Sequence, residues 1–419
     1  MNLLVIGSGA REHAILAALK RSPQAGCLFA APGNAGTAAI ATNLPVGASD
    51  IPALLAAARQ HAVELTVVGP ETPLAEGAVD CFREAGLAIF GPTRAAARIE
   101  SSKAFAKELM QRHGIPTAAS RSFDSHEKAV AYVKAQETPM VVKADGLAAG
   151  KGVVVARTRE EALQALEECM VRRAFGDAGE RVVVEECLSG REVSVFAFTD
   201  GESISPLVAA CDYKRAQDGD QGPNTGGMGG YSPPGFWTPA LARQIEEGII
   251  RPTVRALAQA GAPYTGVLYA GLMLTSQGPQ VLEFNCRLGD PETQVVLPRL
   301  ETDLVEVVEA VCKGELHRVA LRWSQQACVG VVVASGGYPG EYRTGLHISG
   351  LEQVPEGALV FHAGTATSDG SVVTSGGRVL TVVGRGRDLA DARQRAYAAA
   401  KRITFQGAFY RTDIAAVAV

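Results

Sequence analysis

The chain has 419 residues, of which 47% are hydrophobic and 20% charged, and its formal net charge is −4. This length exceeds one ordinary hydrophobic core, so we expect two to four domains. A mildly acidic total without a long basic run argues against a nucleic-acid partner, and no run approaches the ~18 apolar residues of a membrane span. The chain starts without an export signal, so its eight cysteines are expected to be buried free thiols in a reducing cytoplasm.

The first hundred residues alternate short apolar runs with helical segments, which predicts a parallel sheet with helices on both faces. The turn APGNAGT follows the second strand, and Asn34 and Gly36 there would present main-chain amides where such sheets bind ligands. An ordinary turn is the alternative. Strands are expected at residues 3–6, 27–31, 65–68 and 87–92, and helices at residues 12–20, 52–61, 74–85 and 101–112.

The opening run VIGSGAREHA is similar to the start of a dinucleotide-binding unit, but Glu12 stands where the third glycine of Gly-x-Gly-x-x-Gly belongs. Ala30 and Ala31 stand where such a unit carries the acidic residue that binds the ribose. These two departures argue against a nicotinamide oxidoreductase. Gly7 and Gly9 still permit a tight turn, and the amides at the start of the following helix favour an anion.

A glycine-rich link between two strands is predicted in the run VVKADGLAAGKGVVVA. Lys143 ends the first strand, and Gly146, Gly150 and Gly152 surround Lys151. Glycine amides can approach a polyphosphate closely, and the two lysines would neutralise its oxygens. The run is not a Walker A loop because a glycine, and not Ser or Thr, follows the second lysine. A flexible hairpin with exposed lysines is the alternative.

Acidic residues follow in the run VVVEECLSGREVSV, with Glu185 and Glu186 at the end of one strand and Glu192 in the next. These carboxylates could accept hydrogen bonds from a ribose while main-chain groups meet an adenine edge. Acids exposed to solvent at a strand end are the alternative. The stretch 211–235 is rich in Gly and Pro and has no hydrophobic period, which predicts a long functional or disordered loop.

Two paired strands are predicted at residues 266–275 and 279–290. Because side chains alternate along a strand, Glu283 and Asn285 point to the same face, and Arg287 follows on that face. Two oxygen ligands on one face suit Mg²⁺, which takes few protein ligands together with substrate phosphates. A structural hydrogen-bonded pair is the alternative, because buried polar groups must be paired.

A last α/β unit is predicted from about Gln325. It begins with the apolar run CVGVVVA, continues with a hairpin at residues 370–384 and ends with a helix at residues 388–403. The chain shows no internal repeat and no low-complexity tract.

Six strings occur in one order, namely VIGSGAREHA, PGNAGT, VVGPETPL, KADGLAAGKGV, GPNTGGMGGYSP and EFNCRLGDPETQ. In order and wording they resemble the phosphoribosylamine–glycine ligases, also called glycinamide ribonucleotide synthetases, a family of the ATP-grasp superfamily. The resemblance runs from the first residue to the last helix. It implies an α/β chain with an α+β central part. The implied parts are a Rossmann-like N-terminal domain (1–100), a central ATP-grasp domain (101–121 and 191–325), an inserted ATP-clamp lid (122–190) and a small C-terminal α/β domain (326–419).

The resemblance also implies an activity, in which glycine is joined to 5-phosphoribosylamine through glycyl phosphate while ATP becomes ADP and phosphate, with Mg²⁺ or Mn²⁺, in de novo purine synthesis. The implied metal ligands are Glu283 and Asn285, and the implied catalytic residues are Lys143, Arg287 and Asp290. The implied ATP-binding residues are Lys103, Lys143, Gly146, Gly150, Lys151, Gly152, Glu185, Glu186, Leu188 and Glu192. The implied substrate-binding residues are Gly9, Gly33, Asn34, Gly36, Thr37, Asp212, Lys214, Asn224, Thr225, Gly226, Gly227, Arg287 and Asp290.

Two other classes of nucleotide-binding protein remain as alternatives. Another ATP-grasp carboxylate–amine ligase, or a biotin-dependent carboxylase component, shares the architecture but is not expected to carry NTGGMGGYSP. A non-enzymatic nucleotide-binding regulator would keep the lysines but needs no paired metal ligands on one strand. The expected partners are small-molecule substrates, with no nucleic acid and no membrane, and the chain is expected to be a monomer or a weak homodimer.

Overall fold

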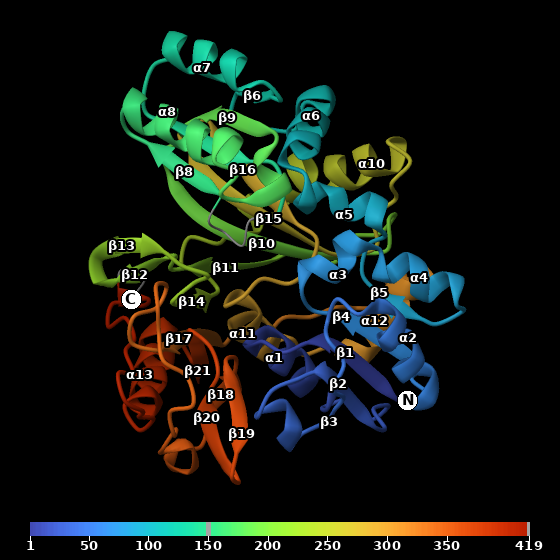
Figure 1. Cartoon of the computed structure of the whole chain (residues 1–419). Helices are drawn as coiled ribbons and strands as arrows, with labels where there is room; N and C mark the ends of the chain where they lie inside the picture. Colours follow the sequence, from blue (N-terminus) through green and yellow to red (C-terminus); the bar gives the residue numbers. More distant parts are fainter. Residues whose placement is uncertain (148–151, 417–419) are drawn as a thin grey trace.

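The computed structural model describes residues 1–147 and 152–416, which form three main sheets (Figure 1). The first sheet is parallel, with the strand order β3-β2-β1-β4-β5. Every residue of β1 is buried, as expected of a strand whose sheet is covered on both faces. The predicted parallel N-terminal sheet is therefore confirmed. Its strands are β1 (Leu3–Gly7), β2 (Leu28–Pro32), β3 (Thr42–Asn43), β4 (Leu65–Val68) and β5 (Ile89–Phe90).

Two helices of this first part have other bounds than predicted, one because of Gly77 and one because of Ser102. The segment expected as one helix at residues 74–85 is two helices, because Gly77 between them has a φ of 92°. The segment expected at residues 101–112 begins after Ser102, whose hydroxyl accepts from the N–H of Phe105 (3.2 Å). The helices are α1 (Ala10–Leu19), α2 (Ile51–Gln60), α3 (Glu71–Glu76), α4 (Ala78–Glu84), α5 (Arg94–Ser101) and α6 (Lys103–His113).

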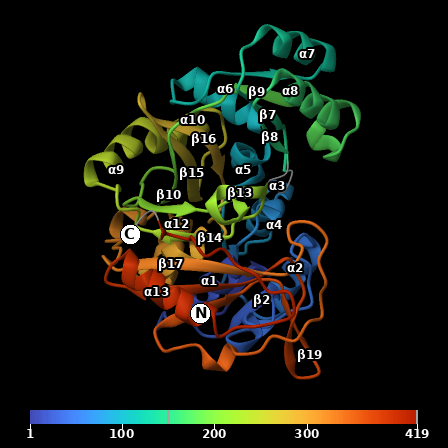
Figure 2. The same cartoon turned by 90° about the vertical axis from the view of Figure 1, so that its left-hand side faces the viewer.

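The second sheet has four antiparallel strands in the order β6-β9-β7-β8 and forms a unit of its own. One cluster of buried apolar side chains, all between Phe123 and Val184, supports it. This unit lies at the top of Figure 1 and projects from the rest of the molecule in the turned view of Figure 2. Its elements are β6 (Ser120–Phe123), α7 (His126–Ala135), β7 (Met140–Ala144), β8 (Val153–Ala156), α8 (Arg159–Leu166) and β9 (Val182–Glu186).

The third sheet has eight strands in the order β16-β15-β10-β11-β14-β17-β21-β18. Strand β14 joins β11 to β17, so the sheet continues from the central part of the chain into the C-terminal part. The strands are β10 (Arg191–Thr199), β11 (Val208–Asp212), β14 (Gly229–Ser232), β15 (Gly266–Thr275), β16 (Gly278–Asn285), β17 (Ala327–Ala334), β18 (Ala358–His362) and β21 (Arg378–Gly386).

The glycine-rich stretch 211–235 is not one long loop, as its composition predicted. It contains the hairpin of β12 (Arg215–Gln217) and β13 (Gln221–Asn224) and then β14, whose four residues are all buried. Two of the four residues of β14 are glycines, so the strand has no hydrophobic period. Main-chain hydrogen bonds to the two neighbouring strands β11 and β17 stabilise it instead. Composition alone does not show such pairing.

The predicted C-terminal hairpin at residues 370–384 is also wrong. Strand β20 (Ser371–Thr374) pairs with β19 (Thr365–Ser368), and β21 pairs with β17 and β18. The turn lies at Asp369 and Gly370, both with positive φ (49° and 76°), which is the Asp-Gly arrangement of a tight hairpin. The expected final helix is present as α13 (Leu389–Ala400), and Asp388 caps it.

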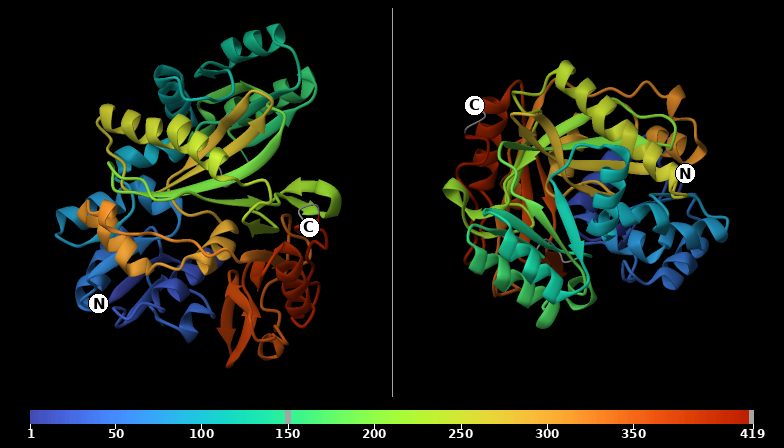
Figure 3. Two further views of the ribbon diagram at one scale, coloured as in Figure 1. Left: turned by 180° about the vertical axis from the view of Figure 1, so that it is seen from behind. Right: turned by 90° about the horizontal axis from the view of Figure 1, so that it is seen from above.

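The remaining helices connect the strands of the third sheet, and seen from behind the first and last parts of the chain lie side by side below the four-stranded unit (Figure 3, left). Contacts between α1 and β18 join these two parts. None of the helices in the described ranges has the length and apolarity that a membrane crossing requires. The remaining α-helices are α9 (Pro239–Ile245), α10 (Arg251–Gln259), α11 (Glu292–Val296) and α12 (Leu304–Lys313). Short 3₁₀ or π turns are η1 (Thr37–Ala39), η2 (Glu167–Val171), η3 (Gly176–Gly179), η4 (Asp218–Asp220), η5 (Glu246–Ile250), η6 (Leu297–Arg299), η7 (Leu316–Arg318) and η8 (Leu351–Gln353).

All eight cysteines lie in the described residues and are free thiols. Four of them are buried, whereas Cys27 is exposed, so the expectation of buried thiols holds for only part of the set.

Candidate active site

The end of strand β16 places Glu283 and Asn285 on one face, as the sequence predicted. Their partners across the sheet are Gly271 and Tyr269, and the pairing is regular between these two positions. A bulge at Leu282 precedes them and frees its carbonyl to accept from Lys143 Nζ (3.0 Å). Within the described residues, no hydrogen bond or ion pair uses the side-chain oxygens of Glu283 or Asn285. The structural-pair alternative therefore does not hold, and both oxygens remain available to a ligand.

Four cationic side chains surround Glu283. Burial would raise its pKa, but Lys143, Lys214, Lys103 and Arg287 together lower it below the usual value. The carboxylate is therefore ionised at neutral pH. Several of these cations also pair with other carboxylates, namely Lys143 with Glu185, Lys214 with Glu192 and Arg287 with Glu71 and Glu100. Lysine and arginine side chains from four segments thus meet near this strand end, where they can bind the oxygens of a polyanion such as a triphosphate.

Lys143 also belongs to a buried group of charges with Lys107 and Glu185. Both ammonium groups lie 3.0 Å from the same oxygen, Oε2 of Glu185, and both lysines and the glutamate are nearly inaccessible to solvent. Burial lowers the pKa of Lys107 to about 8, although Glu185 opposes the shift. The other oxygen of this carboxylate, Oε1, is buried without a hydrogen-bond partner. It is therefore an acceptor for a donor that the described residues do not supply.

The run that follows β9 carries the other acidic residues of the predicted nucleotide site. Glu186 is exposed, and its carboxylate accepts from the N–H of Ala119 (3.1 Å). Glu192 lies on β10, half-exposed, 2.5 Å from Lys214 Nζ, which is also 3.9 Å from Asp212. Burial raises the pKa of Asp212 to about 7, with Glu292 and Glu192 adding to the rise and Lys214 opposing it.

The predicted phosphate loop is described only at its two ends. Lys103 Nζ donates to the carbonyl of Gly146 (2.9 Å), and the carbonyl of Gly152 accepts from the N–H of Ala144 (2.8 Å). The first end of the loop is thereby tied to the start of α6. Gly150 and Lys151 lie outside the described residues.

Arg287 is held between two carboxylates from the first part of the chain. Its Nε donates to Glu71 (3.1 Å) and its Nη2 to Glu100 (2.9 Å). The second oxygen of Glu100 accepts from the N–H (2.8 Å) and the thiol (3.0 Å) of Cys286. Burial raises the pKa of Glu100 despite the opposing charge of Arg287. These bonds fix the chain directly after the strand that bears the candidate metal ligands.

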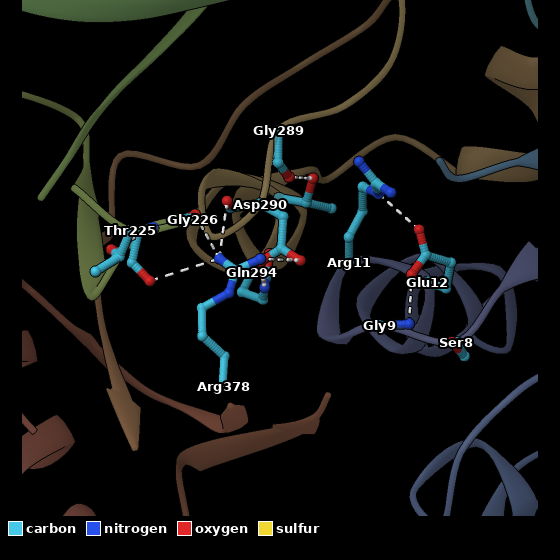
Figure 4. A network of polar contacts seen from close by, with 12 residues as sticks. Ser8, Gly9, Arg11, Glu12, Thr225, Gly226, Gly289, Asp290, Gln294 and Arg378 are labelled. Atoms are coloured by element: carbon cyan, nitrogen blue, oxygen red, sulfur yellow. Dashed lines mark hydrogen bonds and ion pairs between the residues drawn. The ribbon is translucent and has the colours of Figure 1, made fainter. Parts of the chain in front are cut away.

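Asp290 lies at the centre of a second network, shown in Figure 4, which joins three distant segments. Its Oδ1 accepts from Gln294 Nε2 (2.8 Å), and its Oδ2 lies 3.2 Å from Arg378 Nη2. Arg378, at the start of β21, also donates through Nη1 to the carbonyls of Gly226 (2.5 Å) and Asp290 (3.1 Å). The N–H of Gly226 in turn donates to the hydroxyl of Tyr338 (3.0 Å).

The loop before Gly226 closes on itself. The carbonyl of Lys214 accepts from both the N–H (2.7 Å) and the hydroxyl (2.9 Å) of Thr225, and the same hydroxyl accepts from the N–H of Gly227 (2.9 Å). Asn224 is exposed and pairs with Arg215 across the hairpin. The loop therefore brings Lys214 and the glycines that contact Arg378 into one short segment.

The first glycine turn ends in an unexpected contact. The N–H of Gly9 donates to Oε2 of Glu12 (2.6 Å), and the other oxygen of that buried carboxylate pairs with Arg11 Nε (2.6 Å; Figure 4). Glu12 thus supplies the anion at this helix start, so the amide of Gly9 is not available to a ligand. A side chain added at Gly7 would collide with Glu12 (2.6 Å), which explains the small residue there. A side chain on Gly9 would reach within 3.6 Å of Asp290, so this turn borders the second network.

The side chains of the turn APGNAGT are used inside the protein. Asn34 Nδ2 donates to the carbonyls of Ser8 (2.8 Å) and His362 (2.7 Å), and its Oδ1 accepts from the N–H groups of Gly36 (2.8 Å) and Thr37 (3.0 Å). Gly33 has a φ of 72°, and its N–H donates to the carbonyl of Gly7 (3.1 Å). The turn therefore joins the first sheet to β18, and only its shape is left to contribute to a ligand site.

The residues of these networks that were not predicted from the sequence include Glu71, Glu100, Lys107, Gln294, Tyr338 and Arg378. The sequence indicates Lys107 weakly, because it lies four residues after Lys103 on the largely buried face of α6. Nothing in the sequence indicates Arg378, because its partners Asp290 and Gly226 are 88 and 152 residues away in the chain.

The two networks are joined by the short chain between Arg287 and Asp290. Lysines from three segments and Arg287 act electrostatically on Glu283 at one end of this chain, and Arg378 pairs with Asp290 at the other. Cations beside uncommitted carboxylate and amide oxygens suit a reaction in which a metal-bound polyphosphate transfers a phosphoryl group. No group suited to nucleophilic attack by a protein side chain is needed for such a transfer.

Comparison with known proteins identifies the family to which this fold and these residues belong. Residues 1–100, 101–293 and 328–417 match the N domain, the ATP-grasp (A) domain and the C domain of the phosphoribosylglycinamide synthetase family. The phosphoribosylamine–glycine ligase of Vibrio parahaemolyticus is 52% identical over 418 residues, which cover 99% of this chain and 97% of that protein. The crystal structure of the phosphoribosylamine–glycine ligase of Thermotoga maritima is 34% identical with a TM-score of 0.87, covering 99% of this chain and 100% of that one.

A more distant solved structure shares the fold alone. The biotin carboxylase domain of the Hydrogenobacter thermophilus 2-oxoglutarate carboxylase, solved with MgADP, ADP and bicarbonate, is 19% identical with a TM-score of 0.74 over 98% of this chain and 91% of that one. The full-length matches at higher identity all point to one group of ATP-grasp enzymes. The chain belongs to the phosphoribosylamine–glycine ligase family.

Proposed function

We propose that the protein joins glycine to 5-phosphoribosylamine at the expense of ATP, giving glycinamide ribonucleotide, ADP and phosphate in purine biosynthesis. The observation that carries the proposal is the end of strand β16. There Glu283 and Asn285 have uncommitted oxygens, Lys143 donates to the neighbouring carbonyl of Leu282, and Lys103, Lys214 and Arg287 are close enough to lower the pKa of Glu283. Family membership supplies the identity of the substrates.

In the proposed site, ATP lies between the four-stranded unit and β16. Oε1 of Glu185, buried without a donor, is suited to accept from the amino group of adenine. The other proposed adenine contacts are Glu186 and Leu188, and Glu192 is the proposed ribose contact. The proposed phosphate contacts are Lys103, Lys143, Gly146 and Gly152, with Gly150 and Lys151 of the segment outside the described residues.

Glu283 and Asn285 would hold Mg²⁺ or Mn²⁺, and their uncommitted oxygens fit a hard cation. When bound, the ion would neutralise and orient the phosphates of ATP. The other two substrates, glycine and 5-phosphoribosylamine, are proposed to bind along the network of Arg287 and Asp290. Gly9, Gly33, Asn34, Gly36 and Thr37 are proposed to contribute shape, because the hydrogen-bonding groups described for them are already used. The remaining proposed contacts are Asp212, Lys214, Asn224, Thr225, Gly226 and Gly227.

The chemistry follows from these positions in two steps. An oxygen of the glycine carboxylate attacks the γ-phosphorus, the bond to the β,γ-bridging oxygen breaks, and ADP leaves with that electron pair. The neutral amine of phosphoribosylamine then attacks the acyl carbon of glycyl phosphate, the carbon–oxygen bond breaks, and phosphate and a proton are released. Lys143 and Arg287 neutralise the charge that develops on oxygen, and the positioned loops bring the reactants together.

The reaction is tested by ADP release with glycine alone and with glycine plus phosphoribosylamine. Full turnover is expected only with both substrates, and label from carboxyl-¹⁸O glycine is expected in the released phosphate. Turnover without phosphoribosylamine, or unlabelled phosphate, contradicts the proposal.

The metal ligands are tested by Glu283→Ala and Asn285→Ala, with Gln280→Ala on the same strand as the matched control. We expect the two site variants to lose Mg·ATP-dependent turnover by at least about a hundredfold and to lose Mn²⁺ binding measured by electron paramagnetic resonance. Retention of Mn²⁺ binding by both would reject the assignment.

The remaining expectations stand as proposals. They are a cytoplasmic location, a monomer or weak homodimer, and the four-part division at residues 1–100, 101–121 with 191–325, 122–190 and 326–419. Because the eight-stranded sheet crosses the last boundary, we expect the central and C-terminal parts to unfold together.

A further inference from the structure

The segment after α13 carries a buried arginine that reaches the β12–β13 hairpin. The side chain of Arg411 is 1% exposed. Its Nε and Nη2 donate to the two carboxylate oxygens of Asp413 (2.8 and 2.7 Å), and its Nη1 donates to the carbonyl of Arg215 (3.0 Å) and to Asp220 (2.9 Å). The planar guanidinium thereby links the C-terminal segment to the hairpin at two points.

The neighbours of Arg411 repeat the same connection through the main chain. The N–H of Thr412 donates to Asp218 (2.8 Å), and the N–H of Gly219 donates to Asp413 (2.8 Å). Asp218 and Gly219 form the turn of the hairpin. The turn and one strand of the hairpin are therefore both attached to the C-terminal segment.

Apolar burial contributes little to the order of the hairpin. Ala216 is its only buried residue among positions 215–224, all of which are described. A two-stranded hairpin with no apolar core is marginal in water by itself. Main-chain bonds of Tyr213 with Gly229 and Met228 and of Lys214 with Thr225 hold its base, and the attachment to residues 411–413 holds its turn and its first strand.

Lys214 lies directly between two residues that the C-terminal segment holds. Before it, the ring of Tyr213 packs 4.7 Å from the guanidinium of Arg411, and the Tyr213 hydroxyl accepts from the N–H of Ala415 (2.9 Å). After it, the carbonyl of Arg215 accepts from Arg411. Lys214 itself is half-exposed, forms an ion pair with Glu192 and helps to lower the pKa of Glu283.

We infer that Arg411 is a positioning residue for Lys214, through which the C-terminal segment sets the charge balance of the catalytic centre. The inference rests on the proposed function, in which Lys214 faces the anionic substrates. A lysine has a long flexible side chain, so its charge is directed only as well as its main chain is fixed.

A double-mutant cycle of Lys214→Ala and Arg411→Lys tests the inference, with Arg387→Lys on the exposed surface as the matched control. The Michaelis constants of all substrates are measured, and the one that Lys214→Ala raises is followed. In the protein with Lys214 unchanged, Arg411→Lys is expected to raise that Michaelis constant by about tenfold. In the Lys214→Ala background it is expected to change that constant less than about twofold, because the group it positions is gone. Additive effects, or a Lys214→Ala variant with unchanged kinetics, overturn the inference.

Hydrogen exchange of the substrate-free protein gives a second, independent measurement. Arg411→Lys is expected to accelerate amide exchange at residues 213–224 by about tenfold or more, with β1 and β17 unchanged. Uniform acceleration across the protein would show a merely structural role and overturn the inference. This measurement needs no turnover. It therefore tests the role of Arg411 even if the proposed function is wrong and the protein ligates another amine.

Asp220→Asn keeps the test available if Arg411→Lys does not fold. Asp220 is 73% exposed and contributes one of the bonds to Arg411, so its replacement spares the core. We expect the same Michaelis constant to rise by about threefold and the same peptide to exchange faster. No change in either measurement overturns the inference.

Discussion

Arg378 and Asp290 form an ion pair of 3.2 Å although 88 residues separate them in the chain. The same arginine donates to the carbonyls of Asp290 and Gly226, so one side chain of β21 holds both loops that border the proposed substrate site. The C-terminal part of the chain thus takes part in forming the site.

Arg378→Ala is expected to lower kcat/KM for phosphoribosylamine by about a hundredfold, because Asp290 loses its counter-ion and two loops lose their shared donor. The measurement is steady-state kinetics with each substrate varied in turn. Arg387→Ala, at an arginine whose side chain is 89% exposed, is the control and should behave as the unchanged protein. Equal kinetics for both variants would show that the ion pair has no role in the site.

Glu100→Gln is expected to lower kcat by about tenfold to a hundredfold and to destabilise the protein by about 1–3 kcal/mol. The reason is that Arg287 and the N–H of Cys286 both bind this buried carboxylate. Glu71→Gln is the matched comparison, because Glu71 binds the same arginine but is more exposed, and its effect should be smaller. Urea unfolding and initial rates measure the two effects, and a larger loss at Glu71 would reverse our ranking.

Lys107→Met is expected to raise the KM for ATP by about tenfold, because Glu185 then has only one of its two lysine partners. Methionine fills similar space without charge, so cavity formation contributes little. Lys134→Met on the exposed face of α7 is the control. An unchanged KM for ATP with a changed KM for glycine would place Glu185 elsewhere than at the nucleotide.

Lowering the pH should destabilise the contact between α1 and β18. Burial, with a contribution from His362, lowers the pKa of His13 to about 3, and burial lowers that of His362 to about 4. His13 Nδ1 accepts from the N–H of His362 (2.9 Å), which requires this nitrogen to be unprotonated. The unfolded chain binds more protons than the folded chain below about pH 6.5, so the free energy of unfolding falls as the pH drops from there toward about 4, by about 1–2 kcal/mol per histidine at pH 5.

Urea unfolding at pH 7.5 and pH 5 measures this loss. His13→Asn is expected to reduce the difference between the two pH values, whereas His347→Asn at an exposed histidine should leave it unchanged. The same pH dependence in the His13 variant and the unchanged protein would exclude the buried histidines as its source.

The sequence predicted those features that depend on local pattern. The continuous apolar run of β1 gave the parallel sheet, and the alternation along β16 placed Glu283 and Asn285 on one face. It did not predict β14, because two glycines in a strand have no hydrophobic period and only the neighbours β11 and β17 show that they pair.

Contacts across long separations in the chain escaped prediction for a different reason. Glu71 is part of a recognised string and Glu100 lies in the last turn of α5, but only the folded chain shows that both meet Arg287. The first turn shows the same limit, because its pattern predicted an anion at the helix start without indicating that Glu12 is that anion.

Glu12 has a consequence for the kind of ligand that the first turn can accept. Its carboxylate occupies the Gly9 amide, at the turn where a dinucleotide pyrophosphate would bind, and Arg11 neutralises it there. A dinucleotide would therefore have to displace a side chain of the protein itself before it could use that amide. The turn keeps the outline of a cofactor site, while one of its anion-binding groups is already used inside the protein.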